Sequence, residues 1–137
     1  MENNRKDLII WAAGFFDGEG SVFLRKSSRG SFTVRIAVGQ VNPTPIRMLL
    51  RLFGGHISQQ KPPKGKDWKP QWRWEQDSKS AVSTLEELLP HLKVKLDVAL
   101  LAIEFQKLKK RGQKFSKTKF QIEKDFKEKI SFLNHKD

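Results

Sequence analysis

The stretch Trp11–Gly20, WAAGFFDGEG, constrains this chain most, because its most apolar run stops at two acids that are set among glycines. Apolar residues before the acids recur at the 3.6-residue spacing of one helix face. Glycine is the residue that most often follows the end of a helix. The pattern therefore predicts a helix over about residues 5–18, which we call the motif helix, with two carboxylates at its end.

The two acids, Asp17 and Glu19, lie where the motif helix gives way to a basic segment. Carboxylates weaken the binding of a polyanion unless a cation lies between them and its phosphates. Carboxylate oxygens suit Mg²⁺, which shares phosphate oxygens, and a metal-activated water can hydrolyse a phosphodiester. For Asp17 the alternative stays open that its side chain only satisfies backbone groups at the helix end.

Gly14 and Gly18 lie four residues apart and share one face of the motif helix. A glycine inside a helix costs about 1 kcal/mol relative to alanine, so a compensating role is expected. A face without side chains lets another backbone approach closely. If this face pairs with a second copy of the chain, the two Glu19 side chains meet near a two-fold axis. The alternative is that Gly14 is simply tolerated.

Positive charge is concentrated in the middle of the chain. The 137 residues carry a net charge of +12, and residues 21–76 carry eleven Lys or Arg against two acids, Asp67 and Glu75, which gives +9. A basic segment with so few acids favours a nucleic-acid partner, and a charge that serves only solubility is the alternative. A membrane partner is disfavoured, because the basic residues do not lie on one amphipathic helix.

The cysteine count and the apolar runs bear on compartment. The chain contains no cysteine, which excludes disulfides and thiolate metal sites and fits a reducing compartment. Its longest apolar run is far shorter than the roughly 20 residues that span a bilayer, and it lacks the flanks of a signal peptide. We expect one domain over residues 1–137, in a soluble intracellular protein of a bacterial or archaeal cytoplasm or of an organelle.

The rest of the chain alternates between strand and helix patterns. Period-two alternation predicts one hairpin over about residues 21–41 and a second around the basic, proline-rich loop 61–70. A helix capped by Thr44 lies between the hairpins, and three helices follow, the first capped by Asp77 or Ser78. The chain is therefore predicted to be an α+β domain with the order αββαββααα.

The same patterns predict the core. Trp72 and Trp74 lie on alternate residues of one strand and are expected to face inward, with an exposed platform for stacking bases as the alternative. The predicted core stripes of two helices consist of Ile46, Leu49, Leu50, Phe53, Leu96, Leu100, Ile103 and Leu108.

The segment Ala12–Gly20, AAGFFDGEG, resembles the LAGLIDADG motif, with Glu19 in the second acidic position. The other matching positions are Gly14, Asp17 and Gly20. Two basic hairpins, the NPTPIRMLL helix between them and HLKVK after them complete an order that resembles the single-motif LAGLIDADG homing endonucleases over roughly residues 5–110. The resemblance implies a homodimer of αββαββα subunits, each with a four-stranded antiparallel saddle for double-stranded DNA. Here a helical extension over about residues 113–137 follows.

The resemblance also implies a reaction and its residues. The family makes site-specific double-strand breaks in long pseudo-palindromic targets, as mobile introns require, by Mg²⁺-dependent phosphodiester hydrolysis. Glu19 and the Gly18 carbonyl would bind the metal, which Mn²⁺ or Ca²⁺ could replace. Gln40 would organise water near the scissile phosphate, and Lys95, or alternatively Lys93, would be the basic catalytic residue.

Interface residues follow from the same resemblance. Ala13, Gly14 and Gly18 would let the motif helices pair in the dimer. Strand parity predicts which side chains face the DNA groove, and the loop lysines are expected to contact phosphates. The predicted DNA contacts are Phe23, Arg25, Ser27, Ser31, Thr33, Arg35, Ala37, Ser58, Gln60, Lys61, Lys64, Lys66, Lys69, Gln71, Arg73 and Glu75.

Other functions stay open. The same fold could serve an RNA maturase that acts on host intron RNA, or a DNA-binding protein that does not cut. Glu19 favours cutting weakly, because such proteins need not keep it. A basic structural protein of ribosomes would fit the charge but would leave the glycine–acid motif unexplained.

Overall fold

The computed structural model describes residues 2–26, 30–110 and 117–135. Within these ranges the chain forms five α-helices, one 3₁₀ helix and four strands. The elements are α1 (Glu2–Glu19), β1 (Gly20–Lys26), β2 (Phe32–Gln40), α2 (Pro43–Phe53), β3 (His56–Gln60), β4 (Gln71–Asp77), α3 (Ser78–Leu88), η1 (Leu89–His91), α4 (Leu96–Lys110) and α5 (Lys117–Asn134). The predicted α+β class and the predicted order αββαββααα, in which three α-helices follow the second hairpin, are confirmed.

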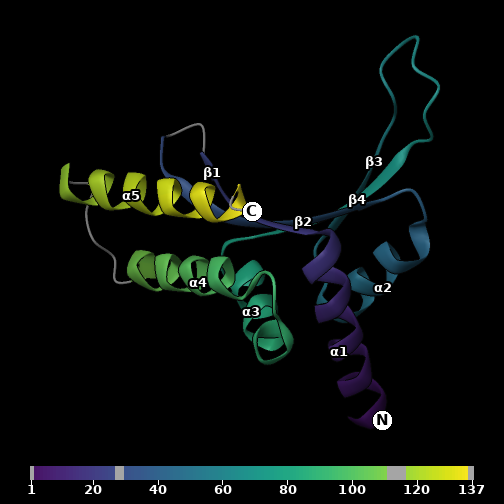
Figure 1. The fold of residues 1–137 in the computed structure, drawn as a ribbon, viewed down its shortest axis with the longest axis horizontal. Helices are drawn as coiled ribbons and strands as arrows, with labels where there is room; N and C mark the ends of the chain where they lie inside the picture. The colour runs from purple at the N-terminus through teal and green to yellow at the C-terminus, as the bar shows by residue number, and fades with distance from the viewer. Residues whose placement is uncertain (1, 27–29, 111–116, 136–137) are drawn as a thin grey trace.

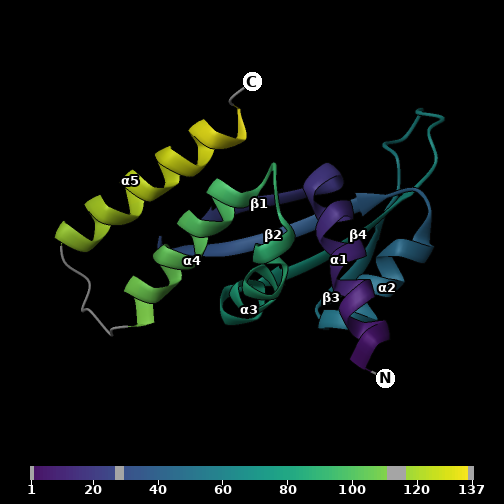
Figure 2. The ribbon, with the colours of Figure 1, turned by 60° about the horizontal axis from the view of Figure 1, so that its bottom comes forward.

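The four strands form one antiparallel sheet in the order β1-β2-β4-β3. Figures 1 and 2 show α1, α2, α3 and α4 on one side of this sheet, and α5 lies along β1 and α4. We call the opposite side of the sheet the open face. The loop between β3 and β4 projects beyond the sheet, away from the helices (Figure 1). No helix in the described ranges is long and apolar enough to cross a membrane.

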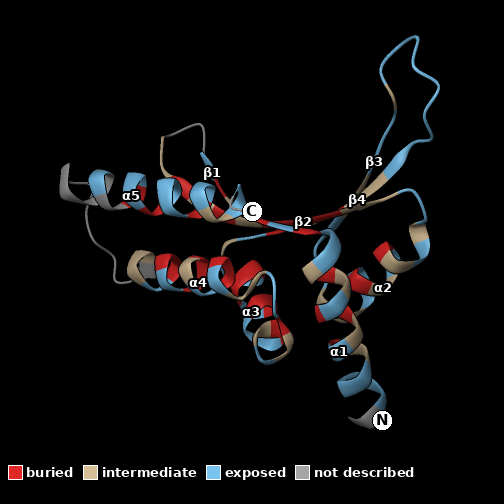
Figure 3. Ribbon diagram, in the orientation of Figure 1, coloured by how far each residue is buried: buried red, intermediate tan, exposed pale blue. Residues whose placement is uncertain are grey.

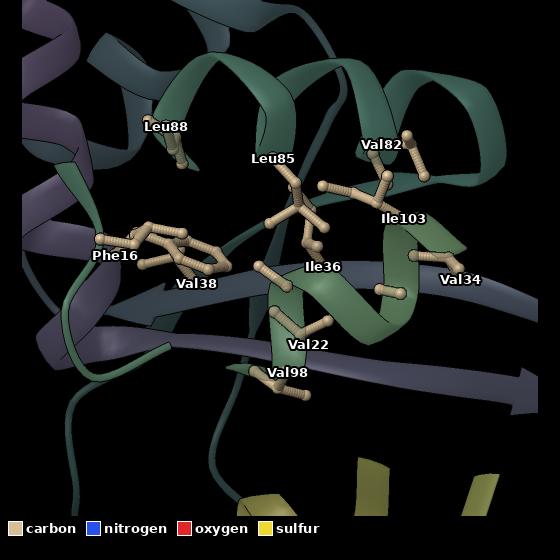
Figure 4. Packing of buried hydrophobic residues seen from close by; sticks show 14 of the residues in the cluster. Phe16, Val22, Val34, Ile36, Val38, Val82, Leu85, Leu88, Val98 and Ile103 are labelled. Atoms are coloured by element: carbon tan, nitrogen blue, oxygen red, sulfur yellow. The ribbon is translucent and has the colours of Figure 1, made fainter. Parts of the chain in front are cut away.

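The core lies between the sheet and the helices, as the buried segments in Figure 3 show. Alternate residues of β1 and β2 point into it, among them Val22, Ile36 and Val38, which meet Phe16 of α1 and Leu85 of α3 (Figure 4). This alternation is what period two predicts for a sheet with one covered face. The first hairpin pattern thus correctly separated the buried side of the sheet from its open face.

The two tryptophans of β4 face the helices, as predicted. Trp74 is fully buried, and its Nε1 donates a hydrogen bond of 2.7 Å to the carbonyl of Gly54. Trp72 is half-buried, and the guanidinium of Arg47 from α2 lies 5.8 Å from its ring centre. An aromatic ring covered in this way is not an exposed platform for bases.

Two predicted core residues and one predicted cap, Thr44, are wrong. Leu50 is 37% exposed and Leu100 is 46% exposed, because each helix meets the molecule with a narrower stripe than its apolar pattern. Helix α2 is capped by Asn42, whose side chain accepts a hydrogen bond from the backbone N–H of Thr44, so Thr44 is not the cap. Asp77 occupies the cap position of α3 but makes no capping hydrogen bond with its side chain.

Gly55 lies directly before β3 at a position that no side chain fits. Its φ is +103°, and a Cβ there would lie 2.7 Å from the carbonyl oxygen of Glu75 and 2.9 Å from Nε1 of Trp74. Gly55→Ala is therefore expected to lower the free energy of unfolding by about 2–4 kcal/mol. The loss comes from strain at a positive φ and from the clash of the new Cβ with the carbonyl oxygen of Glu75, which is backbone and cannot move aside as a side chain could. Denaturant titration measures this loss.

The matched control is Gly65→Ala, because Gly65 also has a positive φ, of +88°, but its Cβ would meet no atom within 4 Å. Strain alone predicts a loss of about 1 kcal/mol there. Equal losses in both variants would contradict the close approach of Gly55 to β4.

Candidate active site and open face

Helix α1 passes into strand β1 without a loop, because α1 ends at Glu19 and β1 begins at Gly20. The helix ends one residue later than predicted, so both acids belong to its last turn. Gly20 pairs with Val38 in the sheet, and Gln40 ends β2 two residues further on. Glu19 and Gln40 therefore lie at the same end of the first hairpin. A Cβ at Gly20 would overlap the buried ring of Phe16, which explains the last glycine of the motif.

Asp17 anchors the loop that precedes α4. Its Oδ2 accepts a hydrogen bond of 2.7 Å from the backbone N–H of Lys93, and its Oδ1 accepts one of 2.9 Å from that of Lys95. The carbonyl of Lys95 in turn accepts from the N–H of Ala99 in the first turn of α4. Asp17 thus satisfies backbone groups, as its alternative reading proposed, but they belong to this loop and not to its own helix end. The contact brings Lys95 to the end of the sheet that carries Glu19 and Gln40.

Asp17→Ala removes both of these hydrogen bonds to a charged acceptor. We expect the free energy of unfolding to fall by about 2 kcal/mol, since hydrogen bonds to ionised groups are worth more than neutral ones. Denaturant titration checks the loss against Asp97→Ala, an exposed acid in the first turn of α4. That control loses only a helix-dipole interaction of about 0.3–1 kcal/mol. Equal losses would mean that anchoring by Asp17 adds nothing.

Glu19 has an exposed carboxylate, and within the described ranges no hydrogen bond or ion pair occupies it. The carbonyl of Gly18 lies in the last turn of α1, where carbonyls have no partner further along the helix. The last turn holds no basic side chain, and the end of a helix dipole is negative there. Oxygen atoms and negative charge therefore gather at this point, which suits a cation.

The small-residue face of α1 is open. Gly14 and Gly18 are exposed, and a Cβ added to either would meet no atom within 4 Å. Ile10, one turn before Gly14 on the same face, is 45% exposed. Ala13, which was predicted to join this face, is 0% exposed and belongs to the core of its own subunit, because it lies about 100° around the helix from Gly14. We therefore correct the predicted interface set by removing Ala13.

The open face carries the predicted DNA contacts, with two exceptions. Ala37 is only 4% exposed, because its small side chain lies between its register partners Ser21 and Glu75, so it is not available to DNA. Ser27 lies outside the described residues. The other side chains are exposed or half-buried: Phe23, Arg25, Ser31, Thr33, Arg35, Ser58, Gln60, Gln71, Arg73 and Glu75 on or beside the strands, and Lys61, Lys64, Lys66 and Lys69 in the loop.

Two of the predicted DNA contacts, Arg35 and Arg73, are paired with acids. Nε and Nη2 of Arg35 donate to the carboxylate of Asp77 at 2.6 and 3.0 Å, and its Nη1 lies 2.9 Å from Glu75. Nε of Arg73 lies 3.3 Å from the same Glu75. The hydrogen bond to Asp77 raises the pKa of Arg35 above its ordinary value, so Arg35 stays charged in this network. The network holds both guanidinium groups in fixed orientations on the open face.

Known proteins provide a comparison for this arrangement. No protein-family model matches the sequence, and no relative is found among curated proteins. The homing endonuclease I-CvuI, solved in complex with its target, matches 98% of this chain and 86% of its own at 22% identity, with a TM-score of 0.76. The archaeal intron-encoded homing endonuclease I-Vdi141I, complexed with DNA, matches 100% of this chain and 88% of its own at 14% identity, with a TM-score of 0.75.

The LAGLIDADG meganuclease I-AabMI, bound to uncleaved DNA, matches 93% of this chain and 43% of its own at 16% identity, with a TM-score of 0.60. The chain has the LAGLIDADG homing-endonuclease fold. In this fold α1 is the motif helix, and its last turn adjoins the sheet end that carries Gln40.

Sequence reasoning missed one residue of the LAGLIDADG sheet, Asp77. It occupies the N-cap position of α3, as predicted, and it also lies directly opposite Arg35 in the register between β2 and β4, which was not predicted. A sequence without an alignment holds no signal for this register, because the strands are far apart in the chain.

A groove of about 610 Å³ between α3 and α4 is lined by lysines and glutamates and holds none of the predicted site residues, so its size does not make it the site.

Proposed function

We propose that this protein is a site-specific DNA endonuclease that acts as a homodimer on a long pseudo-palindromic duplex. One observation carries the proposal: the exposed carboxylate of Glu19 ends α1 at the same end of the basic sheet as Gln40 and the loop of Lys95. Non-specific attraction to a polyanion follows from the net charge of +12. Hydrolysis of that polyanion needs the acid.

The donor set at the end of α1 fits a divalent metal. Glu19 offers carboxylate oxygens and Gly18 a carbonyl, which are ligands that Mg²⁺ prefers, and Mn²⁺ or Ca²⁺ accepts the same donors. No three His, Cys, Asp or Glu side chains gather within the described part of this subunit. Water, phosphate oxygens and the Glu19 carboxylate of a second copy would complete the shell. I-CvuI was solved with DNA in the presence of Ca and of Mg. When bound, the metal would supply Lewis-acid activation of water and of the phosphate.

The other residues of the site have positioning and electrostatic roles in this proposal. The Gln40 amide would hold a water beside the scissile phosphate by donating and accepting hydrogen bonds. The Lys95 ammonium would stabilise the charge that develops on the phosphate oxygens. Asp17 would act as a positioning residue, because its hydrogen bond to the backbone N–H of Lys95 fixes where the Lys95 backbone lies.

The dimer is proposed from the small-residue face of α1. Two such faces allow close approach of helix backbones, because nothing in the subunit fills the space above Gly14 and Gly18. Pairing there would also cover Ile10. Since Glu19 follows Gly18, this pairing would bring two catalytic acids to one axis, as cutting both strands requires.

The test is selection and cleavage of an immobilised randomised duplex library by the full chain in Mg²⁺, in Ca²⁺ and in EDTA. We expect sequence-selective retention in Ca²⁺ and release of fragments with defined ends in Mg²⁺ only. Tight, selective binding without cutting in Mg²⁺ would overturn the enzyme and favour a maturase, which binding to host intron RNA would then test. No retention of any duplex would overturn DNA binding itself.

A further inference from the structure

The loop between β3 and β4 presents a large aromatic ring to solvent. Trp68 is 57% exposed, and it stands in a loop, residues 61–70, that carries four lysines against the one acid Asp67. The loop projects beyond the sheet on the side away from the helices (Figure 1). Trp68 is not needed for the core, because Trp72 and Trp74 already fill that part of it. An exposed ring among lysines indicates a surface that binds a partner.

A groove of about 470 Å³ lies beside this ring, and we call it the loop groove. Its lining residues are Val41, Gln60, Lys61, Trp68, Lys69 and Gln71. Trp68 and Val41, which is 44% exposed, supply its apolar surface, and the two lysines supply its charge. Gln60 and Gln71 are register partners in the sheet and supply amide groups. No acid lines the groove.

The loop groove adjoins the proposed catalytic end of the sheet. Val41 directly follows Gln40, and Gln40 pairs with Trp72, one residue from Gln71. A duplex that brings its scissile phosphate to Gln40 therefore passes the groove within a few nucleotides. The apolar and cationic surfaces match a DNA strand, in which apolar deoxyribose units alternate with phosphates.

We propose that the loop groove binds the sugar–phosphate backbone of the target duplex close to the cleavage site. Trp68 packs against a deoxyribose, and Lys61 and Lys69 pair with the phosphates on either side of it. The inference rests on the proposed DNA-binding function and adds a contact that charge alone does not supply. Phosphate pairing gives salt-dependent affinity, whereas packing of an aromatic ring gives affinity that salt hardly changes.

The experiment uses the full chain in Ca²⁺ and a fluorescent duplex that wild type has selected. Trp68→Ala is expected to raise Kd by about ten-fold, because each of the two subunits loses a ring–sugar contact worth about three-fold, less than a ring stacked on a base. Trp68→Phe is expected to restore most of the affinity. The salt dependence should not change in Trp68→Ala, whereas Lys69→Ala should lower the log–log slope by about 1.8, because each of the two subunits loses one phosphate contact. Hydroxyl-radical footprinting should show lost protection of deoxyribose at a few positions beside the cut in Trp68→Ala.

The matched control is Phe132→Ala, which removes an exposed ring, 67% exposed, from α5, a helix that packs on α4 and β1 and not on the β3–β4 loop. It should bind and protect DNA like wild type. Wild-type Kd and footprint in Trp68→Ala, with its circular dichroism unchanged, would overturn the inference and leave the proposed function intact. If wild type retains no duplex at all, the proposed function fails first, and the two failures are distinguished.

Discussion

Glu19→Gln is expected to lower the cleavage rate of the selected duplex in Mg²⁺ by about a thousand-fold or more, while its affinity for that duplex in Ca²⁺ stays within about three-fold. The substitution keeps the size and the hydrogen-bonding reach of the side chain but removes the charge that a divalent cation requires. Affinity survives because phosphate contacts by the basic residues of the sheet and loop dominate binding.

Folding should not change in this variant, since the Glu19 carboxylate is exposed and has no partner within the described ranges. Surface substitutions of this kind alter stability by about 0.5 kcal/mol or less. Single-turnover cleavage and fluorescence anisotropy measure the two quantities, with Glu104→Gln on the exposed side of α4 as the control. Cleavage at the wild-type rate by Glu19→Gln would remove this acid from the mechanism, and equal loss in the control would show a non-specific effect.

Gly14→Leu is expected to convert the dimer into a folded monomer that does not cut both strands. A side chain at Gly14 meets open space within the subunit, and leucine favours the helix by roughly 0.8 kcal/mol over glycine, so the subunit itself should not lose stability. The same side chain would hold two α1 helices apart, which separates the two Glu19 groups. Analytical ultracentrifugation gives the mass. Conversion of a supercoiled plasmid that carries the target into nicked or into linear DNA shows whether one strand or both strands are cut.

Two variants frame this result. Gly14→Ala adds only a methyl group and should weaken association less than leucine does. Glu104→Leu adds the same side chain at an exposed position of α4 and should leave the dimer intact. A Gly14→Leu protein that sediments as a dimer and cuts like wild type would place the interface on another surface.

The sheet could be predicted from the sequence because its pattern is local. Alternation assigns each residue of β1 and β2 to one side of the sheet, and the apolar residues mark the side that faces the core. The sequence predicts the buried faces of helices less well. The apolar stripes that contain Leu50 and Leu100 are wider than the helix surface that the rest of the subunit covers, so these two side chains are exposed. Ala13 shows the same limit on a finer scale, because small residues serve equally well in a core and in an interface between helices.

The sequence supplied candidate residues for the site but not the contacts that position them. Glu19, Gln40 and Lys95 come to one end of the sheet through the register of β1 with β2 and through two hydrogen bonds to Asp17. These contacts join residues that are far apart in the chain, so no spacing rule gives them. The network of Arg35 with Asp77 is of the same kind.

The last helix has a consequence for how this chain avoids self-assembly. Strand β1 is an edge of the sheet, and edges with free backbone groups recruit other strands into aggregates. Helix α5 runs along this edge, and Nδ2 of Asn134 donates a hydrogen bond of 2.8 Å to the carbonyl of Val22. The other edge, β3, has only five residues and is mostly polar. The C-terminal helix thus covers the longer and more apolar edge, so that this edge is shielded from pairing with a strand of another copy.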